Sequence, residues 1–571
     1  MLRMNKLLKR LRIGPYEIAA LSIIGSAFLL RLAMVISGWP EMDSDEGTMG
    51  LEALHIAFRH ERPIFLYGQN YMGTLEAYLG ALLFRLFGTS LLSLRLGMLL
   101  LFTLFLVSLY LLTSLIYSKK LALVALALLS VGARNILLPE IRAVGGAVET
   151  LLFGTLLMLL ACWLALTAER EMLPHRCHLR LAAYAGWGLS VGLGLWSHVL
   201  VVPFILTSGL ILIIFCYREW RTWAPAFLLA GLIIGAIPLM RYNMTAAPGQ
   251  NSLDVALKVH SASDVPVSPD QVSYAKRLSG TLLFSVPVAT NINPYCDLKE
   301  MPLFGPATSR TLACTLIDGG WSVGYIILLC IAIILALLPL WKLLRLHWAR
   351  NQTWSSEERT GSIIHFSRLM LLVSGALTLA LFTVSPLAAL KPWSTRYLIG
   401  LLILTPAVIW PIWNGLSTAI TPISANKPGT RQLVVRSVLL CLLGMTFLVE
   451  YANNFSDIAT SAQINRSDAI LARDLSRIGI KRIYSGYWVC DRLMFASHEQ
   501  IVCSVVETNL TIGLNRYYRY HVAVAADRGA PYVFPLGSDF SQAAEKNPTL
   551  NNGHYRRFTL DGYVIYQPLR T

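Results

Sequence analysis

The chain has 571 residues, of which 55% are hydrophobic and only 14% are charged. Soluble proteins carry about 25% charged residues, so this composition excludes a solvated enzyme, a coiled coil and a disordered chain, and it indicates a polytopic membrane protein. The formal net charge of +16 does not indicate a nucleic-acid partner. Excess Lys and Arg in membrane proteins normally lies in cytoplasmic loops, and no zinc-ligand spacing or basic-aromatic cluster accompanies it.

Apolar stretches of about 20 residues predict membrane-spanning helices. The first stretch, 15–38, follows a basic segment like the n-region of a signal peptide, but it is long and has no A-x-A cleavage site. We therefore predict an uncleaved first helix with a cytoplasmic N-terminus. Ten further spans are predicted at 91–117, 121–139, 147–167, 181–197, 199–217, 223–241, 321–341, 369–390, 397–419 and 433–450.

The segment 74–88 is apolar but too short for a span, and it contains Glu76 and Arg85. It is predicted to be an interfacial or re-entrant helix. The loop charges support this count of eleven spans, because counting 74–88 as another span would move the basic loops to the outside. The C-terminus is then expected on the outer side of the membrane.

Three long segments, 39–90, 242–320 and 451–571, are predicted on the outer side of the membrane. The last has the pattern of a small α/β domain, which divides the chain into a transmembrane module, 1–450, and a domain on the outer side, 451–571. Within that domain the expected elements are a helix at 457–478, strands at 481–489 and 500–506 with a short helix between them, and strands near PYVF and YVIYQPL.

Four of the nine cysteines fall in predicted outer segments, as two pairs. These pairs are Cys296 with Cys314 and Cys490 with Cys503. An oxidising compartment would permit a disulfide in each pair, and the alternative is four free cysteines.

Four carboxylates stand within six residues just after the first span: Glu41, Asp43, Asp45 and Glu46. Clustered carboxylates repel one another, so they need a role or full solvation. The functional interpretations are a general base, a divalent-cation site or both, and the alternative is a solvated acidic loop. Acidic loops in general are more often simply solvated, but the position of this cluster at the bilayer surface, beside a short amphipathic helix, gives the functional interpretation equal weight.

Charged side chains also stand at the outer ends of later spans. Glu149 follows Gly145-Gly146 at the start of 147–167, seven residues after Arg142, and such an acid and base could hold a charged headgroup. Glu149 could equally snorkel to water. Arg396 lies at the outer end of 397–419. Arg31, inside the first span, is either a functional candidate or a snorkelling side chain.

His198 stands at the outer break between the spans 181–197 and 199–217. It is either an interfacial hydrogen-bonded histidine or a contact for a phosphate. The sequence contains no P-loop, Rossmann glycine fingerprint, HExxH or CxxC motif, and its predicted cytoplasmic loops are too short for a nucleotide-binding domain. An ATP-driven transporter and a nucleotide-sugar enzyme with a soluble catalytic domain are therefore disfavoured.

Several of these stretches resemble a known family. DSDEGTMGLEAL and YGQNYMGTLEAYLGALLFRLFGTSLLSLRL are similar to the first outer loop of family 39-type glycosyltransferases, the GT-C membrane enzymes related to protein mannosyltransferases and lipid A aminoarabinose transferase. RAVGGAVETLLFG is similar to their second acidic site. GLWSHVLVVPFIL is similar to the segment in which relatives often carry a basic residue. The resemblance covers most of the first 220 residues.

The resemblance implies a polytopic α-helical GT-C protein of about eleven transmembrane helices. It implies transfer of a sugar from a polyprenyl-phosphate donor to an envelope lipid, polysaccharide or protein, at the periplasmic face of the bacterial inner membrane, by an inverting displacement. The alternatives are a lipid or sugar transporter, whose usual hydropathy repeat is not evident here, and an inactive scaffold.

The resemblance also assigns roles to residues. Asp45 would be the general base for the acceptor, with Glu46 beside it and Glu149 as a second acid that assists the acceptor or holds a divalent cation. His198 replaces the usual basic residue near the donor phosphate, so its charge there depends on pH. The remaining candidates are Arg142 and Arg396 for the phosphate, and Asp43 and Glu76 for the acceptor or a metal.

Overall fold

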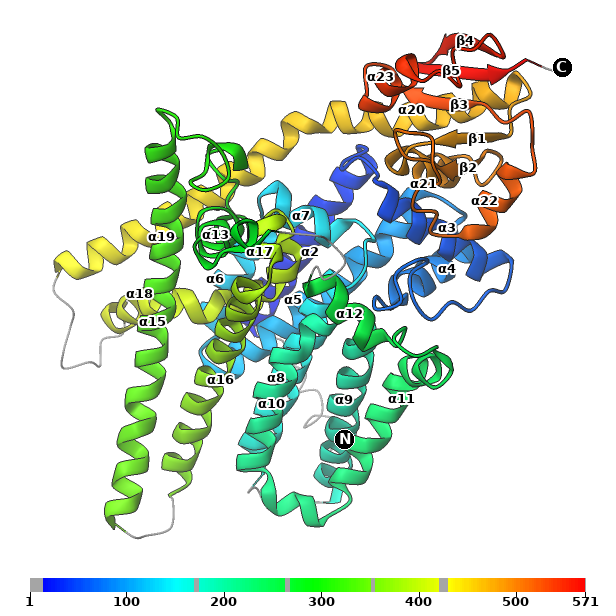
Figure 1. Ribbon diagram of the computed structural model, residues 1–571. Helices are drawn as coiled ribbons and strands as arrows, with labels where there is room; N and C mark the ends of the chain where they lie inside the picture. Colours follow the sequence, from blue (N-terminus) through cyan, green and yellow to red (C-terminus); the bar gives the residue numbers. More distant parts are fainter. Residues whose placement is uncertain (1–13, 169–173, 262–267, 351–354, 421–429, 570–571) are drawn as a thin grey trace. The chain divides into compact units, whose positions relative to one another are not determined.

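The computed structural model describes residues 14–168, 174–261, 268–350, 355–420 and 430–569 (Figure 1). The described chain forms two compact units. The helical unit takes in the described residues up to Leu30, with Leu101–Leu137 and Gly146–Asn454, and the mixed unit takes in Arg31–Leu100, Leu138–Gly145 and the chain from Phe455 onward. The C-terminal segment thus shares its unit with the first predicted outer segment, and a domain boundary at 450/451 stays a prediction.

Long helices dominate the chain (Figure 1). Eight described segments are long and apolar enough to cross a membrane, and the pair α6 (Lys119–Ser130) and α7 (Arg134–Ile141), bent by 91°, is a ninth if it counts as one span. The eight are α2 (Pro15–Ile36), α5 (Leu91–Ile116), α8 (Ala147–Thr167), α11 (Ala224–Thr245), α15 (Thr311–Arg350), α16 (Ser356–Val384), η6 (Thr395–Leu404) with α18 (Thr405–Ile420), and α19 (Thr430–Asn453).

The two remaining predicted spans are also helical. They are α9 (Pro174–Ser197), and η1 (Val199–Val201) with α10 (Val202–Phe215), and α10 is short for a membrane span. Every predicted span therefore coincides with helix, while the number of membrane crossings stays a prediction. The basic N-terminal residues used for the orientation lie outside the described residues.

The bend between α6 and α7 exposes backbone groups that side chains satisfy. The Ala133 amide donates to Oδ1 of Asn291 at 2.6 Å, and Nδ2 of Asn454 donates to the Gly132 carbonyl at 2.9 Å. Unsatisfied backbone groups are costly inside a membrane protein. The two asparagines therefore stabilise the break.

Small residues let α9 and α11 pack closely. Gly192 of α9 lies against Gly235 of α11, and Gly188 of α9 lies against the α11 backbone, where a Cβ atom would be 2.0 Å from the Leu228 carbonyl oxygen. Glycines four residues apart are the usual means of close helix contact in membranes.

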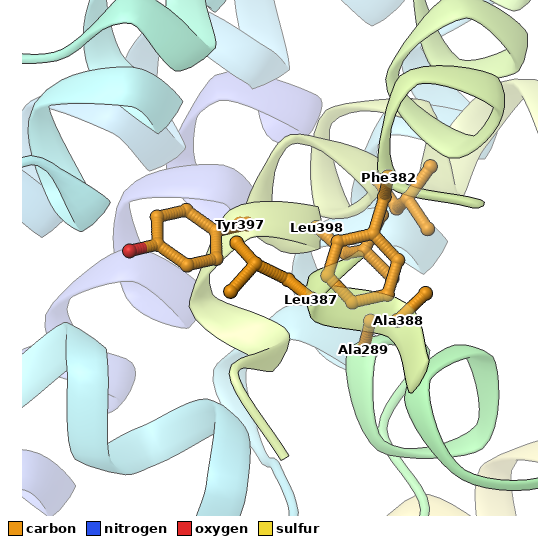
Figure 2. Packing of buried hydrophobic residues seen from close by; sticks show 7 residues of the cluster. Ala289, Phe382, Leu387, Ala388, Tyr397 and Leu398 are labelled. Atoms are coloured by element: carbon orange, nitrogen blue, oxygen red, sulfur yellow. The ribbon is translucent and has the colours of Figure 1, made fainter. Parts of the chain in front are cut away.

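The predicted outer segment 242–320 lies in the helical unit and is mostly short helices. They are α12 (Ser252–Ser261), η3 (Pro269–Val272), α13 (Tyr274–Gly280), the π-helical turn η4 (Thr281–Ser285), α14 (Val286–Ala289) and η5 (Leu298–Glu300). The Cys296–Cys314 disulfide joins this segment to the start of α15. Figure 2 shows α14 packed through Ala289 against Phe382 of α16, Leu387 and Ala388 of α17 (Leu387–Leu390), and Leu398 of η6. The short helix η2 (Tyr217–Arg221) follows α10.

The mixed unit contains α3 (Ser44–Phe58) packed on α4 (Leu75–Phe87), with Arg85 of α4 donating to the Ala57 carbonyl. The predicted short helix at 74–88 is thus present, and its membrane position stays a prediction.

The C-terminal segment adds η7 (Asn454–Asp457), which begins at the unit boundary, α20 (Ile458–Arg477), β1 (Arg482–Ser485), α21 (Tyr487–Ala496), β2 (Val502–Val505), α22 (Tyr518–Ala525), β3 (Tyr532–Pro535), α23 (Asp539–Lys546), β4 (Tyr555–Leu560) and β5 (Tyr563–Pro568).

The five strands form one mixed sheet in the order β2-β1-β3-β5-β4. β1 pairs in parallel with β2 and β3, whereas β5 pairs antiparallel with β3 and β4. The predicted strand at 481–489 ends early, at Ser485, because Gly486 is the N-cap of α21. The Cys490–Cys503 disulfide then joins α21 to β2.

Candidate functional site

The acidic stretch after the first span starts a helix. Asp43 is the N-cap of α3, and its Oδ1 accepts from the Glu46 amide at 2.8 Å. Carboxylates at this end of a helix are favoured by the cap hydrogen bond and the helix dipole. Part of the clustering seen in the sequence therefore has a structural cause.

Arg142 neutralises two members of the acidic cluster. Its guanidinium lies 3.0 Å from Oδ2 of Asp43 and 2.9 Å from Oε1 of Glu41, and Ser461 donates to Glu41 as well. Burial raises the pKa of Asp43, and the Arg142 guanidinium opposes this shift. An arginine that already bridges two carboxylates is a poor phosphate ligand, so the geometry does not support the predicted donor role of Arg142.

Glu46 is engaged in a fully buried ion pair. Arg95 of α5 donates to both carboxylate oxygens, from Nε at 2.8 Å and from Nη2 at 2.7 Å, and neither side chain is exposed. Bidentate pairing of this kind fixes both side chains. The geometry therefore favours a structural role for Glu46 over the predicted catalytic one.

Asp45 is the member of the cluster that contacts the C-terminal segment. Its Oδ1 accepts from the Tyr487 hydroxyl at 2.5 Å and from Nη2 of Arg516 at 2.6 Å, and 18% of its side chain is exposed. It is the predicted base, and it is partly accessible to solvent.

Asp45 begins a polar stripe along α3 that continues with Thr48, Glu52 and His55. The spacing of three or four residues places them on one face of the helix. Thr48 donates to Oδ2 of Asp491 at 2.7 Å, and Nε2 of His55 lies 3.1 Å from Oε1 of Glu499. The stripe therefore faces α21 and the end of that helix.

Glu52 and Asp491 are buried carboxyls in this region. Burial raises the pKa of Glu52 well above its ordinary value, and the Glu61 carboxylate adds to the shift. Burial also raises the pKa of Asp491 from 3.8 to about 6, although the Thr48 hydrogen bond and Arg516 oppose it. Both groups favour the neutral form more than an ordinary carboxyl does.

The raised pKa of Asp491 predicts a pH-dependent effect of Asp491→Asn. The folded protein holds this proton more tightly than the unfolded chain, so the stabilisation is full below about pH 4 and is lost as the pH rises through about 6. Above that pH the ionised form costs about 3 kcal/mol. We expect the variant to match the wild type at pH 4 and to melt at a higher temperature at pH 8.

Intrinsic fluorescence melts of the full-length protein at the two pH values measure this difference. The exposed Asp539→Asn is the matched control and should show no such pH dependence. Equal melting temperatures of Asp491→Asn and the wild type at pH 8 would contradict the prediction.

Two other predicted or candidate residues have structural partners in the mixed unit. Glu76, in the first turn of α4, is buried and accepts from the Gly145 amide at 3.0 Å. Arg31 is buried and donates to Glu140 of α7 at 2.6 Å. Both contacts hold segments distant in sequence together.

The predicted donor residues that lie in the helical unit form a separate group. His198 is the N-cap of η1, and its Nδ1 accepts from the Leu200 amide. Its ring lies 5.9 Å from that of Tyr397 in η6, and Arg396 stacks on Tyr397 with 5.5 Å to the ring centre. The structure thus groups His198 and Arg396 around one tyrosine.

Glu149 belongs to the element beside this group. It is buried in the first turn of α8, whose N-cap is Gly146. Gly146 has φ +80°, and a Cβ atom there would lie 2.7 Å from the His198 ring. Glycine is therefore needed both for the backbone conformation and for the close approach of His198.

An apolar cavity of about 340 Å³ extends from Tyr397 and from Val199 and Leu200, the two residues after His198. Its walls also include residues of α10, α12 and α16, and apolar side chains such as Phe382 and Leu387 form most of its surface. Figure 2 shows the Tyr397 hydroxyl on the side of the ring away from Phe382. Tyr397 is therefore part of the wall of an apolar cavity and also contacts the polar side chains of His198 and Arg396.

The described residues provide few free ligand atoms for the predicted divalent cation. Among them, the one cluster with ligand spacing is Cys296, Glu300 and Cys314, and its two cysteines form a disulfide rather than thiolates. Asp43 is engaged by Arg142, and Asp45 by Arg516. These donor sets do not fit a cation.

Sequence reasoning did not find Tyr487, Asp491 or Arg516. Tyr487 was placed in a predicted strand, and no local pattern marks Arg516. Their contacts with α3 join residues more than 440 positions apart, so no motif in the sequence signals them.

The helical spans and the small mixed sheet are those of a polytopic membrane protein, and the similarity to solved structures gives its fold as GT-C. The chain is similar to the crystal structure of ArnT from Cupriavidus metallidurans bound to undecaprenyl phosphate, with a TM-score of 0.50 and 11% identity over 96% of this chain and 98% of that one. It is also similar to the archaeal oligosaccharyltransferase AglB from Archaeoglobus fulgidus in complex with an inhibitory peptide and a dolichol-phosphate, with a TM-score of 0.45 and 13% identity over 96% of this chain and 74% of that one. No family model and no curated protein matches the chain.

Proposed function

We propose that this protein is a membrane glycosyltransferase that moves a sugar from a polyprenyl-phosphate donor to an acceptor in the cell envelope. The observation that carries the proposal is the apolar cavity that begins at Tyr397, with His198 and Arg396 around that residue. An apolar space beside basic groups suits a lipid phosphate. The likeness in fold to ArnT, whose structure holds undecaprenyl phosphate, supports the same donor class.

The donor half-site lies in the helical unit. The part of the prenyl chain next to the phosphate would occupy the cavity, and the imidazole and guanidinium would stabilise the phosphate charge, which grows when the sugar leaves. Glu149, in the neighbouring first turn of α8, would orient the sugar or the acceptor. Arg142 is left out of this half-site because its guanidinium bridges Glu41 and Asp43.

The acceptor half-site is Asp45 in the mixed unit. In the reaction, the acceptor hydroxyl passes its proton to the Asp45 carboxylate, and the acceptor oxygen forms a bond to the anomeric carbon. The bond from that carbon to the phosphate oxygen breaks, and its electron pair leaves with polyprenyl phosphate. A phosphate leaving group needs no general acid, so one base is enough, and a single displacement inverts the anomeric carbon.

The proposed location is the bacterial inner membrane, with the N-terminus in the cytoplasm and the C-terminus in the periplasm. Both disulfides lie in segments expected outside, where oxidation is possible, and this supports the orientation. A reporter fused after Thr571 tests it, because a reporter active in the cytoplasm would contradict it.

The direct test is donor turnover. We would reconstitute the full-length protein with labelled undecaprenyl-phosphate-linked hexoses, pentoses and amino sugars, together with envelope lipids. Transfer of label from one donor is the expected result. Absence of turnover with every donor, together with flux of sugar or lipid across vesicles, would instead favour the transporter.

The donor half-site predicts a binding defect. A hydrogen bond to a charged group contributes about 1.5–3 kcal/mol, so His198→Ala and Arg396→Ala should each raise the donor KM at least about tenfold. Lys391→Ala, an exposed basic residue five positions before Arg396, is the matched control and should leave KM unchanged. An unchanged KM in both test variants would contradict the donor half-site.

A further inference from the structure

Asp45 is held by two side chains from the C-terminal segment. Arg516 donates from Nη2 to Oδ1 of Asp45, and Tyr487 donates its hydroxyl to the same oxygen. Nε of Arg516 also donates to the Tyr487 hydroxyl oxygen at 2.5 Å. The three groups therefore form a closed triangle in which each touches the other two.

Arg516 is itself fixed in place. Only 4% of its side chain is exposed, and its Nη1 lies 3.4 Å from the Tyr67 carbonyl oxygen. The next residue, Gly68, has φ +72°, and a Cβ atom there would approach the Arg516 Cα to 3.2 Å. The first outer segment thus closes over the arginine, so that the guanidinium has little freedom to leave Asp45.

Arg516 is also shared among several carboxyls. Asp45 is in direct contact with it, while Asp491 and Glu52 feel its charge at longer range. The groups that face Asp45 are thus Arg516, Tyr487 and Asp491, with Asp43, Glu46 and Glu52 on its own helix. Of these carboxyls, Asp45 is the one that accepts a hydrogen bond from the Arg516 guanidinium within the described part of the chain.

We infer that Arg516 and Tyr487 are the positioning residues of Asp45, and that the C-terminal segment thereby completes the acceptor half-site. The inference rests on the proposed function, because it takes Asp45 as the base. Two donors on one oxygen hold the carboxylate plane in a single orientation, and a base within hydrogen-bond reach of its proton must be oriented in this way.

The test uses the full-length protein in lipid nanodiscs and the undecaprenyl-phosphate-linked sugar that the wild type turns over. Arg516→Gln should lower kcat about 100-fold, with the donor KM unchanged within twofold. Without the guanidinium the carboxylate takes up a proton more readily, so the acid limb of the pH–rate profile should move to higher pH. A purely structural loss would leave that limb where it is.

Two further variants should reduce kcat less than Arg516→Gln does. Arg516→Lys keeps the charge but cannot bond Asp45 and Tyr487 as a planar fork does, so it should recover part of kcat and the wild-type acid limb. Tyr487→Phe removes one hydroxyl and should lower kcat about tenfold, and it keeps the test valid if Arg516→Gln does not fold. Arg519→Gln, three residues away with 81% of its side chain exposed, is the matched control and should behave as wild type.

The outcomes separate the inference from the proposed function. If Asp45→Asn is inactive while Arg516→Gln and Tyr487→Phe keep the wild-type kcat and pH profile, the inference is wrong and the function stands. An Arg516→Gln protein faster than wild type also overturns it, because the arginine would then restrain Asp45. Full activity of Asp45→Asn, or no turnover by the wild type, overturns the function and the inference together.

Discussion

Asp45→Asn should reduce sugar transfer by about 10²- to 10⁴-fold, the usual contribution of a general base. The amide keeps the shape of the carboxylate and can still accept from the Tyr487 hydroxyl, but it cannot take the acceptor proton. The donor half-site belongs to other residues, so the donor KM should stay within about twofold. The rate of label transfer from an undecaprenyl-phosphate-linked sugar, followed at several donor concentrations, measures both kcat and the donor KM.

The matched control for this substitution is Glu545→Gln. Glu545 is an exposed carboxylate of the same unit whose ion-pair partner, Arg557, is also on the surface. It should leave kcat and KM unchanged. An Asp45→Asn protein that keeps more than about a tenth of the wild-type rate would exclude a general base at this position.

The helices were predictable because each depends on residues close together in the chain. About twenty apolar residues in a row predict a span whatever the rest of the chain does, and the structure has a helix at each of the eleven predicted places. The pairing of Cys490 with Cys503 was predictable for a similar reason, since the two are only 13 residues apart. Strand limits were less accurate, because Gly486 starts a helix where β-forming residues continue.

The candidate site was only partly predictable. The sequence shows four acids as one cluster, and the structure separates them by their partners: Glu41 and Asp43 with Arg142, Glu46 with Arg95, and Asp45 with Arg516. Three arginines at separations of 49 to 471 residues make this distinction. Local patterns carry no information about such partners, so the sequence located the acids but not their separate environments.

The Glu46–Arg95 ion pair leads to the largest expected loss of stability. Removing one partner of a fully buried pair leaves the other charge without compensation and costs about 3–5 kcal/mol. Glu46→Gln should therefore lower the melting temperature strongly, because Arg95 keeps its charge in a site without solvent access. Glu17→Gln, which breaks the exposed pair of Glu17 with Lys119, is the matched control and should leave the melting temperature unchanged.

A double variant separates stability from catalysis at Glu46. Replacing both partners, as Glu46→Met with Arg95→Met, removes the uncompensated charge, and such apolar replacements often restore stability. Arg95 also donates to the Pro40 carbonyl at 2.9 Å, so recovery should be incomplete. If Glu46 only holds α3 against α5, the double variant should regain transfer along with its melting temperature. A double variant that is stable but inactive would show that the Glu46–Arg95 pair acts in the reaction as well as in the fold, because the fold would then be intact and only these two charged side chains missing.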